Sequence, residues 1–399
     1  MIPHTEALSR LLAPVTPVGT EIVSLAQSSG RIVARTVQAR VSNPPADVSA
    51  MDGYAVRSAD SATVLRVVGT SRAGEPFSGT VHAAEAVRIF TGSIMPEGAD
   101  AVLIQENARL EGGTIVATAP VPDGSFVRRA GQDFAAGQDV VQSGACLNAR
   151  AIGLLAAAGH VWVEVRRRPR VALLTTGDEL SLPGDPLPPG GIYNSNGPML
   201  SALVHAAGAE PVLLPPLPDS REDVAAVLAG LRDIDLVISM GGASVGAHDV
   251  MRDALSMAGF APDFWTIAMR PGKPLMHARK GSLSCIGLPG NPVAALVCGI
   301  VFVLPVIARL QGRTSYQVPT ESATLGCDLG GNDMRFDHLR ARLTFDENGD
   351  TVATPFSKQD SGMLSALSQA DALVLRPSHA PAARAGERCR IIRLAPLGL

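Results

Sequence analysis

The chain has 399 residues, of which 46% are hydrophobic and 18% charged, and it carries a formal net charge of −3. This length exceeds what one hydrophobic core usually serves, so we expect several domains, and the composition excludes a disordered chain. The charge does not indicate nucleic-acid binding. The five cysteines are scattered without a Cys-x-x-Cys pair, so we expect neither a zinc site nor a disulfide framework.

The first third of the chain predicts one helix followed by a β-rich stretch. Residues 5–12 carry apolar side chains at helical spacing, whereas residues 21–34 fit no single pattern. Between residues 42 and 141, short alternating runs such as 64–68 and 101–104 are cut by Gly and Pro. This texture predicts a mostly β region.

Two short motifs in the β-rich stretch place polar residues beside glycine. Asp52 lies in SAMDGYAV and Thr91 lies in FTGS, and each alone is typical of an ordinary turn. Residues 147–158 then predict a helix and residues 161–165 a strand. The basic run at residues 166–170 is interpreted as a solvated connector.

From Val171 onward, strands and helices alternate. Apolar runs predict strands at residues 171–175, 211–214, 236–240, 264–269 and 283–288. Helices are expected at residues 198–207, at residues 250–258, and from Ser220 with Asp223 in capping-box position. Such alternation predicts a parallel sheet with helices on both faces, which binds ligands at the carboxyl ends of its strands.

A nearly continuous apolar run covers residues 293–308. It is shorter than the roughly 20 residues that a membrane span needs, and it contains Pro305, so we expect a helix buried against the sheet. The N-terminus shows no basic segment followed by an apolar run. We therefore expect no signal peptide, no membrane partner and a cytoplasmic location.

After Gly312 the pattern is β again. Residues 339–345 and 351–355 flank an Asp-Glu-Asn-Gly-Asp turn and predict a hairpin, and residues 371–376 and 388–394 predict further strands. A small barrel or sandwich would accommodate them.

These observations predict an α/β plus β fold of several domains around a central parallel-type α/β sheet. We expect a mixed N-terminal linker domain, an inserted β-rich domain, an α/β domain and a small C-terminal β-barrel. Their predicted limits are residues 1–45 with 142–169, 46–141, 170–312 and 313–399.

Four turns in the α/β region follow predicted strands and contain residues suited to phosphate and a metal. They occupy residues 175–180, 241–249, 270–274 and 288–292. Each could be only a turn, because Pro-Gly and Gly-Asn are standard turn dipeptides. Glu179 and Asp249 are acidic there, whereas Arg270 and Lys273 are basic. Carboxylates beside cations suggest Mg²⁺ near a phosphate group.

Taken together, the motifs resemble those of the molybdopterin molybdenumtransferases, the MoeA-type enzymes related to the E domain of gephyrin. The matching stretches run in the family's order over most of the chain: SAMDGYAV, RIFTGSIMPEGADAVLIQE, GQDF, LLTTGDEL, YNSNGPML, GGASVGAHD, MRPGKPL and GLPGNPVAALV. No single stretch is specific, but their combination is.

The resemblance implies a transferase that inserts molybdate into adenylylated molybdopterin with Mg²⁺ and releases AMP, as a step of molybdenum cofactor synthesis. It implies a homodimer in which the β-rich domain of one subunit closes the cleft of the other. A molybdopterin adenylyltransferase is a further implied partner, and neither nucleic acid nor a membrane is implied.

The resemblance also assigns residues. It implies catalytic roles for Asp52, Thr91, Glu179 and Asp249, with Glu179 and Asp249 holding the metal. It implies a substrate cleft formed by Thr176, Gly177, Gly241, Gly242, Ser244, Gly246, Arg270, Pro271, Gly272, Lys273, Pro289, Gly290, Asn291 and Pro292, with Arg340 and Ser361 from the C-terminal domain. Thr266 and Arg270 depart from the family, which often has Lys at both positions, so a cationic role at Thr266 is in doubt.

Three other functions fit parts of the sequence. The first is molybdopterin adenylylation, whose enzymes are generally shorter and lack the β-rich and C-terminal domains. The second is a pterin-binding scaffold without catalysis, against which the presence of Asp52, Glu179 and Asp249 counts. The third is an unrelated nucleotide-binding α/β protein, which the order of the motifs disfavours.

Overall fold

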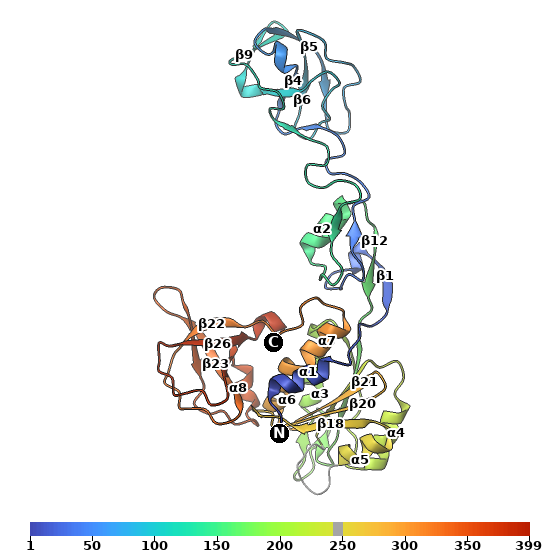
Figure 1. Cartoon of the computed structure of the whole chain (residues 1–399), viewed down its shortest axis with the longest axis vertical. Coiled ribbons are helices and arrows are strands. Elements are labelled where there is room, and N and C mark those ends of the chain that lie inside the picture. Colours follow the sequence, from blue (N-terminus) through green and yellow to red (C-terminus); the bar gives the residue numbers. More distant parts are fainter. Residues whose placement is uncertain (242–249) are drawn as a thin grey trace.

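Figure 1 shows the computed structural model of the chain, which describes residues 1–241 and 250–399. The molecule is elongated. A strand-rich lobe lies at one end, a narrow linker carrying helix α2 (Ala149–Ala157) lies in the middle, and a wide base lies at the other end. The base contains a helix-flanked sheet and, beside it, a small β structure (Figure 1).

The sheet of the base has six strands in the order β16-β13-β17-β21-β20-β18. Four of them run parallel, as predicted: β16 (Glu210–Leu213), β13 (Arg170–Thr175), β17 (Leu236–Met240) and β21 (Leu283–Leu288). Their bounds differ from the predicted ones by at most one residue at either end.

The other two strands run antiparallel to their neighbours, so the parallel-type sheet carries an antiparallel edge. Strand β20 (Pro274–Lys280), which was not predicted, pairs antiparallel with both β21 and β18 (Ala261–Thr266). The turn from β20 to β21 is too short for the crossover that parallel neighbours need, so the two strands form a hairpin. The predicted strand at residues 264–269 is also divided, because Met269–Arg270 (β19) pairs outside this sheet.

Helices cover both faces of the sheet, as predicted. Strand residues alternate between the two faces, so that Leu173 packs in one core and Leu174 in the other. The first face carries α1 (His4–Leu12), α3 (Asn196–Ala206), α6 (Pro292–Cys298) and α7 (Leu304–Leu310). The second carries α4 (Arg221–Gly230) and α5 (Val250–Met257). The hydroxyl of Ser220 caps α4 by accepting a hydrogen bond from the N–H of Asp223 at 3.2 Å.

The apolar run forms a helical segment, Pro292–Leu310, that is long and apolar enough to cross a membrane. It is 83% buried inside the molecule, which agrees with the prediction of a core helix. Residues Gly299–Val303 form a π-helical turn between α6 and α7. Pro305, the second residue of α7, lacks the N–H that an α-helix would donate to the carbonyl oxygen of residue 301, which accounts for an irregularity here.

The linker and the distal lobe are separate β structures. In the linker, β1 (Thr20–Ser24) pairs antiparallel with β12 (Trp162–Arg166) over a core shared with α2. A six-stranded sheet in the order β7-β4-β6-β5-β9-β8 builds the distal lobe. Its strands are β4 (Gly53–Val56), β5 (Val64–Ser71), β6 (Glu85–Ile89), β7 (Ala101–Ile104), β8 (Ala108–Glu111) and β9 (Thr114–Ala117).

The remaining short strands pair in twos. β2 (Val37–Gln38) pairs with β11 (Asp139–Val141), β3 (Val48–Ser49) with β10 (Val127–Arg128), and β14 (Leu180–Ser181) with β15 (Ile192–Tyr193).

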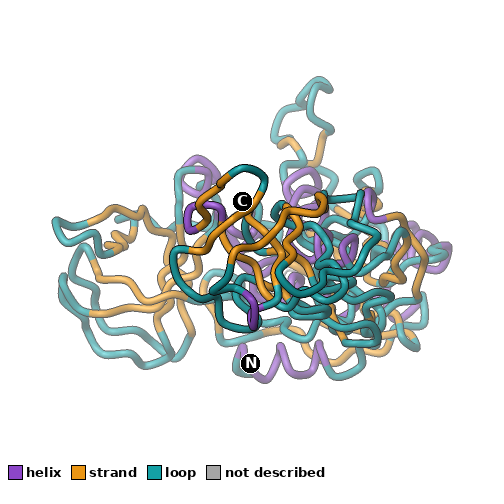
Figure 2. The backbone as a smooth tube through the Cα atoms, turned by 90° about the horizontal axis from the view of Figure 1, so that it is seen from above, coloured by secondary structure: helices purple, strands orange, loops and turns teal. Residues whose placement is uncertain are grey.

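The C-terminal strands close into a barrel. Its five strands pair around the ring as β23-β24-β22-β26-β25 and back to β23, and β19 adds to β23 from outside. Their bounds are Glu321–Leu325 (β22), Phe336–Phe345 (β23), Thr351–Pro355 (β24), Ala372–Arg376 (β25) and Arg388–Arg393 (β26). Figures 1 and 2 both place this strand-rich unit to one side of the helix-flanked sheet.

A buried histidine lies where the barrel meets the N-terminal helix. His338 of β23 is 3% exposed, and its ring lies 5.1 Å from that of Phe336 and 6.4 Å from that of His4. Its Nδ1 has no hydrogen-bond partner among the described residues. Burial lowers the pKa of His338 to about 3, so the folded protein holds this ring neutral.

We therefore expect the free energy of unfolding to fall as the pH drops below about 6.5, the pKa of a histidine in the unfolded chain. Below this pH His338 binds a proton in the unfolded chain but stays neutral in the folded chain. The free energy of unfolding that His338 alone loses by pH 5 is about 2 kcal/mol. Urea unfolding at pH 7.5 and 5 measures it. The variant His338→Leu should lose less stability between the two pH values than the wild type does. An equal loss in both proteins would contradict the prediction.

Candidate functional site

Three of the four predicted turns begin at one rim of the sheet. Thr175 at the end of β13 is paired with Met240 of β17, and Met240 with Leu288 of β21. Because these strands are parallel and in register, the segments that follow them leave the sheet side by side. The rim is therefore built from the ends of three strands that are far apart in the sequence.

The turns approach one another most closely at Gly241. This residue has φ +91°, and a Cβ added to it would lie 2.4 Å from the carbonyl oxygen of Thr176. A Cβ added to Gly290, in contrast, would find its nearest atom, Cα of Gly241, at 3.9 Å. The packing of the rim thus requires glycine at position 241, whereas position 290 has room for a methyl group.

We expect Gly241→Ala to destabilise the protein by about 1–3 kcal/mol, since it combines a strained φ with a steric clash. Gly290→Ala is the matched control and should leave the free energy of unfolding within about 0.5 kcal/mol of the wild type. Chemical denaturation of both variants tests this. Equal stabilities would show that the rim is not tightly packed at Gly241.

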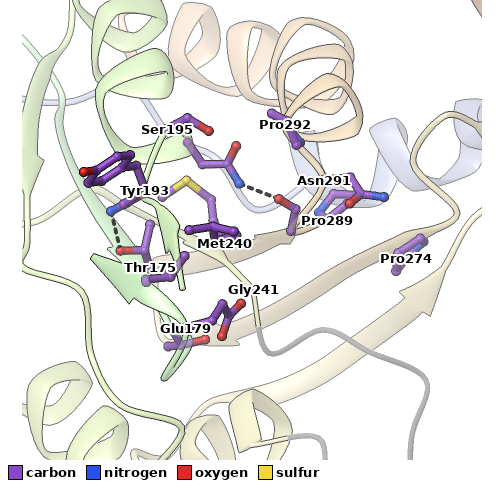
Figure 3. A pocket seen from close by; sticks show the side chains of 16 residues that line it. Thr175, Glu179, Tyr193, Ser195, Met240, Gly241, Pro274, Pro289, Asn291 and Pro292 are labelled. Atoms are coloured by element: carbon purple, nitrogen blue, oxygen red, sulfur yellow. Dashed lines mark hydrogen bonds between the residues drawn. The ribbon is translucent and has the colours of Figure 1, made fainter. Parts of the chain in front are cut away.

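A cavity of ≈ 420 Å³ opens at this rim (Figure 3). Residues predicted for the cleft that line it are Thr176, Glu179, Gly241, Pro289, Gly290, Asn291 and Pro292. In Figure 3, Tyr193 and Ser195 lie on the opposite side of the hollow from Pro289, Asn291 and Pro292, with Glu179 and Gly241 at its lower edge. The volume suits a drug-sized organic molecule.

Sequence reasoning assigned no role to the wall formed by Tyr193, Asn194, Ser195 and Asn196. The amide of Asn194 donates to Oγ1 of Thr175 at 3.0 Å, and Nδ2 of Asn196 donates to the carbonyl oxygen of Gly290 at 2.6 Å. These bonds fasten the wall to the rim. The signal was present in YNSN, a run of hydrogen-bonding side chains directly before a helix.

The fourth turn contributes less to the cavity than expected. Pro274 lines it, but Arg270, Pro271, Gly272 and Lys273 are not among the described lining residues. A Cβ on Gly272 would lie 2.4 Å from Sγ of Cys298, so this glycine serves the packing of the turn on α6. Lys273 is exposed and forms no ion pair within the described part of the chain.

Arg270 was expected to balance phosphate charge, but it points to the barrel. Its guanidinium is paired with Asp337, lies 3.5 Å from Asp333 and donates to Asn332 at 3.2 Å. Two carboxylates therefore already neutralise it. Its observed role is to fasten the turn to the barrel.

Ser361 lies in the loop that follows β24, and Arg340 lies in β23 with its side chain against that loop. Oγ of Ser361 accepts a hydrogen bond from Nδ2 of Asn291 at 2.8 Å, which joins the loop to the rim. Arg340 is 1% exposed, and its guanidinium donates to the carbonyl oxygens of Met363 and Lys358 at 3.3 and 3.4 Å. Arg340 therefore supports the loop that carries Ser361, and its predicted contact with substrate stays a prediction.

Acidic side chains gather around Glu179, which lines the cavity. The Glu179 carboxylate folds over Gly177, where a Cβ would lie 2.6 Å from its Oε2. Asp219, which sequence reasoning missed, lies nearby: its backbone N–H donates to Oδ1 of Asp178 at 3.0 Å. Burial raises the pKa of Asp219, and the negative charges of Asp178 and Glu179 add to the rise. Its position, after a strand and before a capped helix, was readable from the sequence.

Four residues predicted for the central glycine turn, Gly242, Ser244, Gly246 and Asp249, lie outside the described residues. The pairing of Glu179 with Asp249 around a metal therefore stays a prediction. Among the described residues, no group of three His, Cys, Asp or Glu side chains is arranged to hold a metal ion.

Asp52 and Thr91 lie together in the distal lobe, although 39 positions separate them in the sequence. Oδ1 of Asp52 accepts hydrogen bonds from the backbone N–H and the hydroxyl of Thr91, both at 2.8 Å. These bonds, with the charge of Arg88, lower the pKa of Asp52. Figure 1 shows the lobe at the far end of the molecule from the sheet, so this pair and the cavity are well separated within one chain.

The sheet, its glycine turns and the cavity define an α/β protein that binds a small molecule at the carboxyl ends of parallel strands. Residues 2–159 match the MoeA N-terminal region (domain I and II), residues 172–309 the probable molybdopterin binding domain, and residues 322–394 the MoeA C-terminal region (domain IV). The chain belongs to the MoeA family, the molybdopterin molybdenumtransferases of molybdenum cofactor biosynthesis.

Relatives extend over nearly the full chain. A molybdopterin molybdenumtransferase of Haemophilus influenzae is 36% identical and covers 98% of both chains, and one of Mycobacterium tuberculosis is 33% identical over 97% of this chain and 98% of its own. Two structures of a molybdopterin biosynthesis MoeA protein from Pyrococcus horikoshii superpose with a TM-score of 0.85, at 29% and 28% identity, over 98% of this chain and 99% of theirs.

Proposed function

We propose that this protein transfers molybdate into adenylylated molybdopterin and releases AMP, as a magnesium-dependent homodimer in the cytoplasm. The observation that carries the proposal is the cavity at the rim of the sheet, within a chain that matches molybdenumtransferases from end to end. A molybdopterin adenylyltransferase would supply the adenylylated substrate and is the expected partner.

The lining of the cavity supports reversible binding of an anionic organic substrate. The described lining residues include no Lys or Arg, and most of their polar groups are hydroxyls, amides and main-chain atoms. Such groups hold a pterin and its diphosphate by hydrogen bonds without the strong ion pairs that would slow product release. The exposed ammonium group of Lys273, on the turn that leads into Pro274, can balance phosphate charge at the edge.

Mutual repulsion among the carboxylates around Glu179 supports a divalent-cation site there. The pKa of Asp219 is raised partly by the charges of Asp178 and Glu179, and a cation would relieve that repulsion. Glu179 and Asp219, together with Asp249, would hold Mg²⁺, because carboxylate oxygens are its preferred protein ligands. When bound, the ion polarises the phosphoanhydride.

Asp52 and Thr91 have to act on a cavity other than that of their own chain. Hydrogen bonds from Thr91 stabilise the Asp52 carboxylate, which lowers its pKa and keeps it charged. The geometry suits an anionic group that orients a hydrogen-bond donor or a metal-bound water in a partner's cleft. We assign this pair to the site of the second subunit.

Exposed apolar side chains support the homodimer. Met51, Ile94 and Phe126 are exposed in the lobe that carries Asp52 and Thr91, and Leu182, Leu187 and Ile192 are exposed near the cavity. Exposed hydrophobic side chains near both halves of a site are typical of surfaces that are covered on assembly. A twofold dimer would cover the apolar side chains of the lobe and those near the cavity together, because each lobe then meets the cavity of the other subunit.

The test is to incubate the purified protein with adenylylated molybdopterin, Mg²⁺ and molybdate and to follow AMP. We expect AMP release that requires molybdate. Consumption of ATP with unmodified molybdopterin would favour the adenylyltransferase, and pterin binding without AMP release would favour a scaffold.

A further inference from the structure

Two polar atoms in the residues that line the cavity have no hydrogen-bond partner. Oδ1 of Asn196 and Oγ1 of Thr176 are both buried, and neither bonds to any other described residue. Thr176 follows the last residue of β13, and Asn196 is the first residue of α3. A buried unsatisfied polar atom costs roughly 1–3 kcal/mol, so these two atoms are positioned to gain from a ligand.

The orientation of the Asn196 amide is determined by its other atom. Nδ2 donates to the carbonyl oxygen of Gly290 at 2.6 Å, and a carbonyl oxygen can only accept. A flipped amide would place two acceptors against each other. The unpaired atom of Asn196 is therefore the amide oxygen, which can only accept a hydrogen bond.

This acceptor distinguishes between the parts of the substrate. Molybdate and a phosphoanhydride at neutral pH present oxygens without hydrogens, and two acceptors repel. The ring edges of a pterin and of adenine carry N–H donors beside ring acceptors. Oδ1 of Asn196 can take such a donor, and the Thr176 hydroxyl can give or take a hydrogen bond at the same edge.

We propose that Asn196 and Thr176 recognise the N–H edge of the neutral heterocycle of the substrate. The ring then lies against the Tyr193–Asn196 wall, where Tyr193 and the neighbouring Ile192 supply apolar surface. The diphosphate then points away from Asn196, towards the turn that carries the exposed ammonium group of Lys273. This inference rests on the proposed function and adds the direction in which the substrate enters the cavity.

Binding measurements with three separate probes test it. Wild-type protein, Asn196→Ala and Thr176→Val are titrated with a phosphate-free pterin, with AMP and with inorganic pyrophosphate. Each substitution should weaken one heterocycle about tenfold or more while pyrophosphate changes by less than about twofold. The heterocycle that responds, pterin or adenine, is the one that occupies this wall. Thr176→Ser restores the hydroxyl and should recover most of the lost affinity.

Equal weakening of pyrophosphate and heterocycle, or unchanged affinity for both heterocycles, overturns the inference. Thermal unfolding of each variant shows whether it is folded, and a loss confined to one class of probe is not produced by misfolding. Wild-type protein that binds neither heterocycle would instead refute the proposed function. The two failures are therefore distinguishable.

Discussion

Exchange of Glu179 for Gln is expected to lower the rate of molybdate-dependent AMP release by about a hundredfold to a thousandfold. The substitution keeps the size of the side chain, replaces one acceptor oxygen by an N–H donor group and removes one negative charge at the mouth of the cavity. If the Glu179 carboxylate binds Mg²⁺, the affinity of the variant for Mg²⁺ falls together with the rate. Binding of the free pterin should persist, since its proposed contacts lie on the Asn196 wall.

The pKa of Asp219 is a second quantity that tests this prediction. Its pKa is raised by burial and by the charges of Asp178 and Glu179. Removal of the Glu179 charge should move the pKa of Asp219 down towards its ordinary value, which an NMR titration of the carboxyl group detects in metal-free protein. Glu222→Gln is a matched control on the surface of α4, where the carboxylate pairs with Arg221 away from the cavity. Full AMP release by Glu179→Gln, with unchanged dependence on Mg²⁺, would remove this residue from the mechanism.

Mixed dimers of Asp52→Ala and Glu179→Gln chains should be active although each variant alone is inactive. If the lobe of one subunit serves the cavity of the other, a mixed dimer contains one site with both residues intact and one site with neither. Two different affinity tags allow mixed dimers to be isolated. Their expected activity is about half that of the wild type, since one of two symmetric sites works.

The reciprocal dimer makes the result decisive. A chain carrying both substitutions, paired with a wild-type chain, has one damaged residue in each shared site and should be inactive. A site formed within a single chain predicts the reverse, because the wild-type subunit would then keep a complete site. An inactive first dimer together with an active second one would refute the shared site.

The elements that were predicted well are those whose pattern is local. Strand β21 and the hairpin of β23 and β24 follow from apolar runs and a turn of Gly and Asp residues, and the cap of α4 follows from Ser220 and Asp223. The ambiguous stretch after residue 20 becomes β1 only because β12 lies opposite it, and β12 is more than a hundred residues away in the chain. No local pattern carries that pairing.

The site divides in the same way. Glycine, asparagine and proline at strand ends identified the turns at residues 176, 241 and 289–292, because backbone geometry restricts which residues such turns accept. The roles of Arg270 and Arg340 were not predictable from their charge. Arg270 is neutralised by carboxylates of the barrel, and Arg340 is buried among carbonyl oxygens. The partners of each arginine lie in other segments of the sequence.

The sequence by itself determined the order of helices and strands, the closely packed glycine turns and the family to which the chain belongs, because these depend on short-range periodicity and on the order of motifs. Only the tertiary structure decided that Asn196 reaches Gly290, that Asp219 lies near Glu179, and that Asp52 lies far from the cavity in its own chain. Hydrogen bonds and charges act over a few ångströms of space whatever their separation along the chain, so the chemistry of the site appears once the strands are aligned.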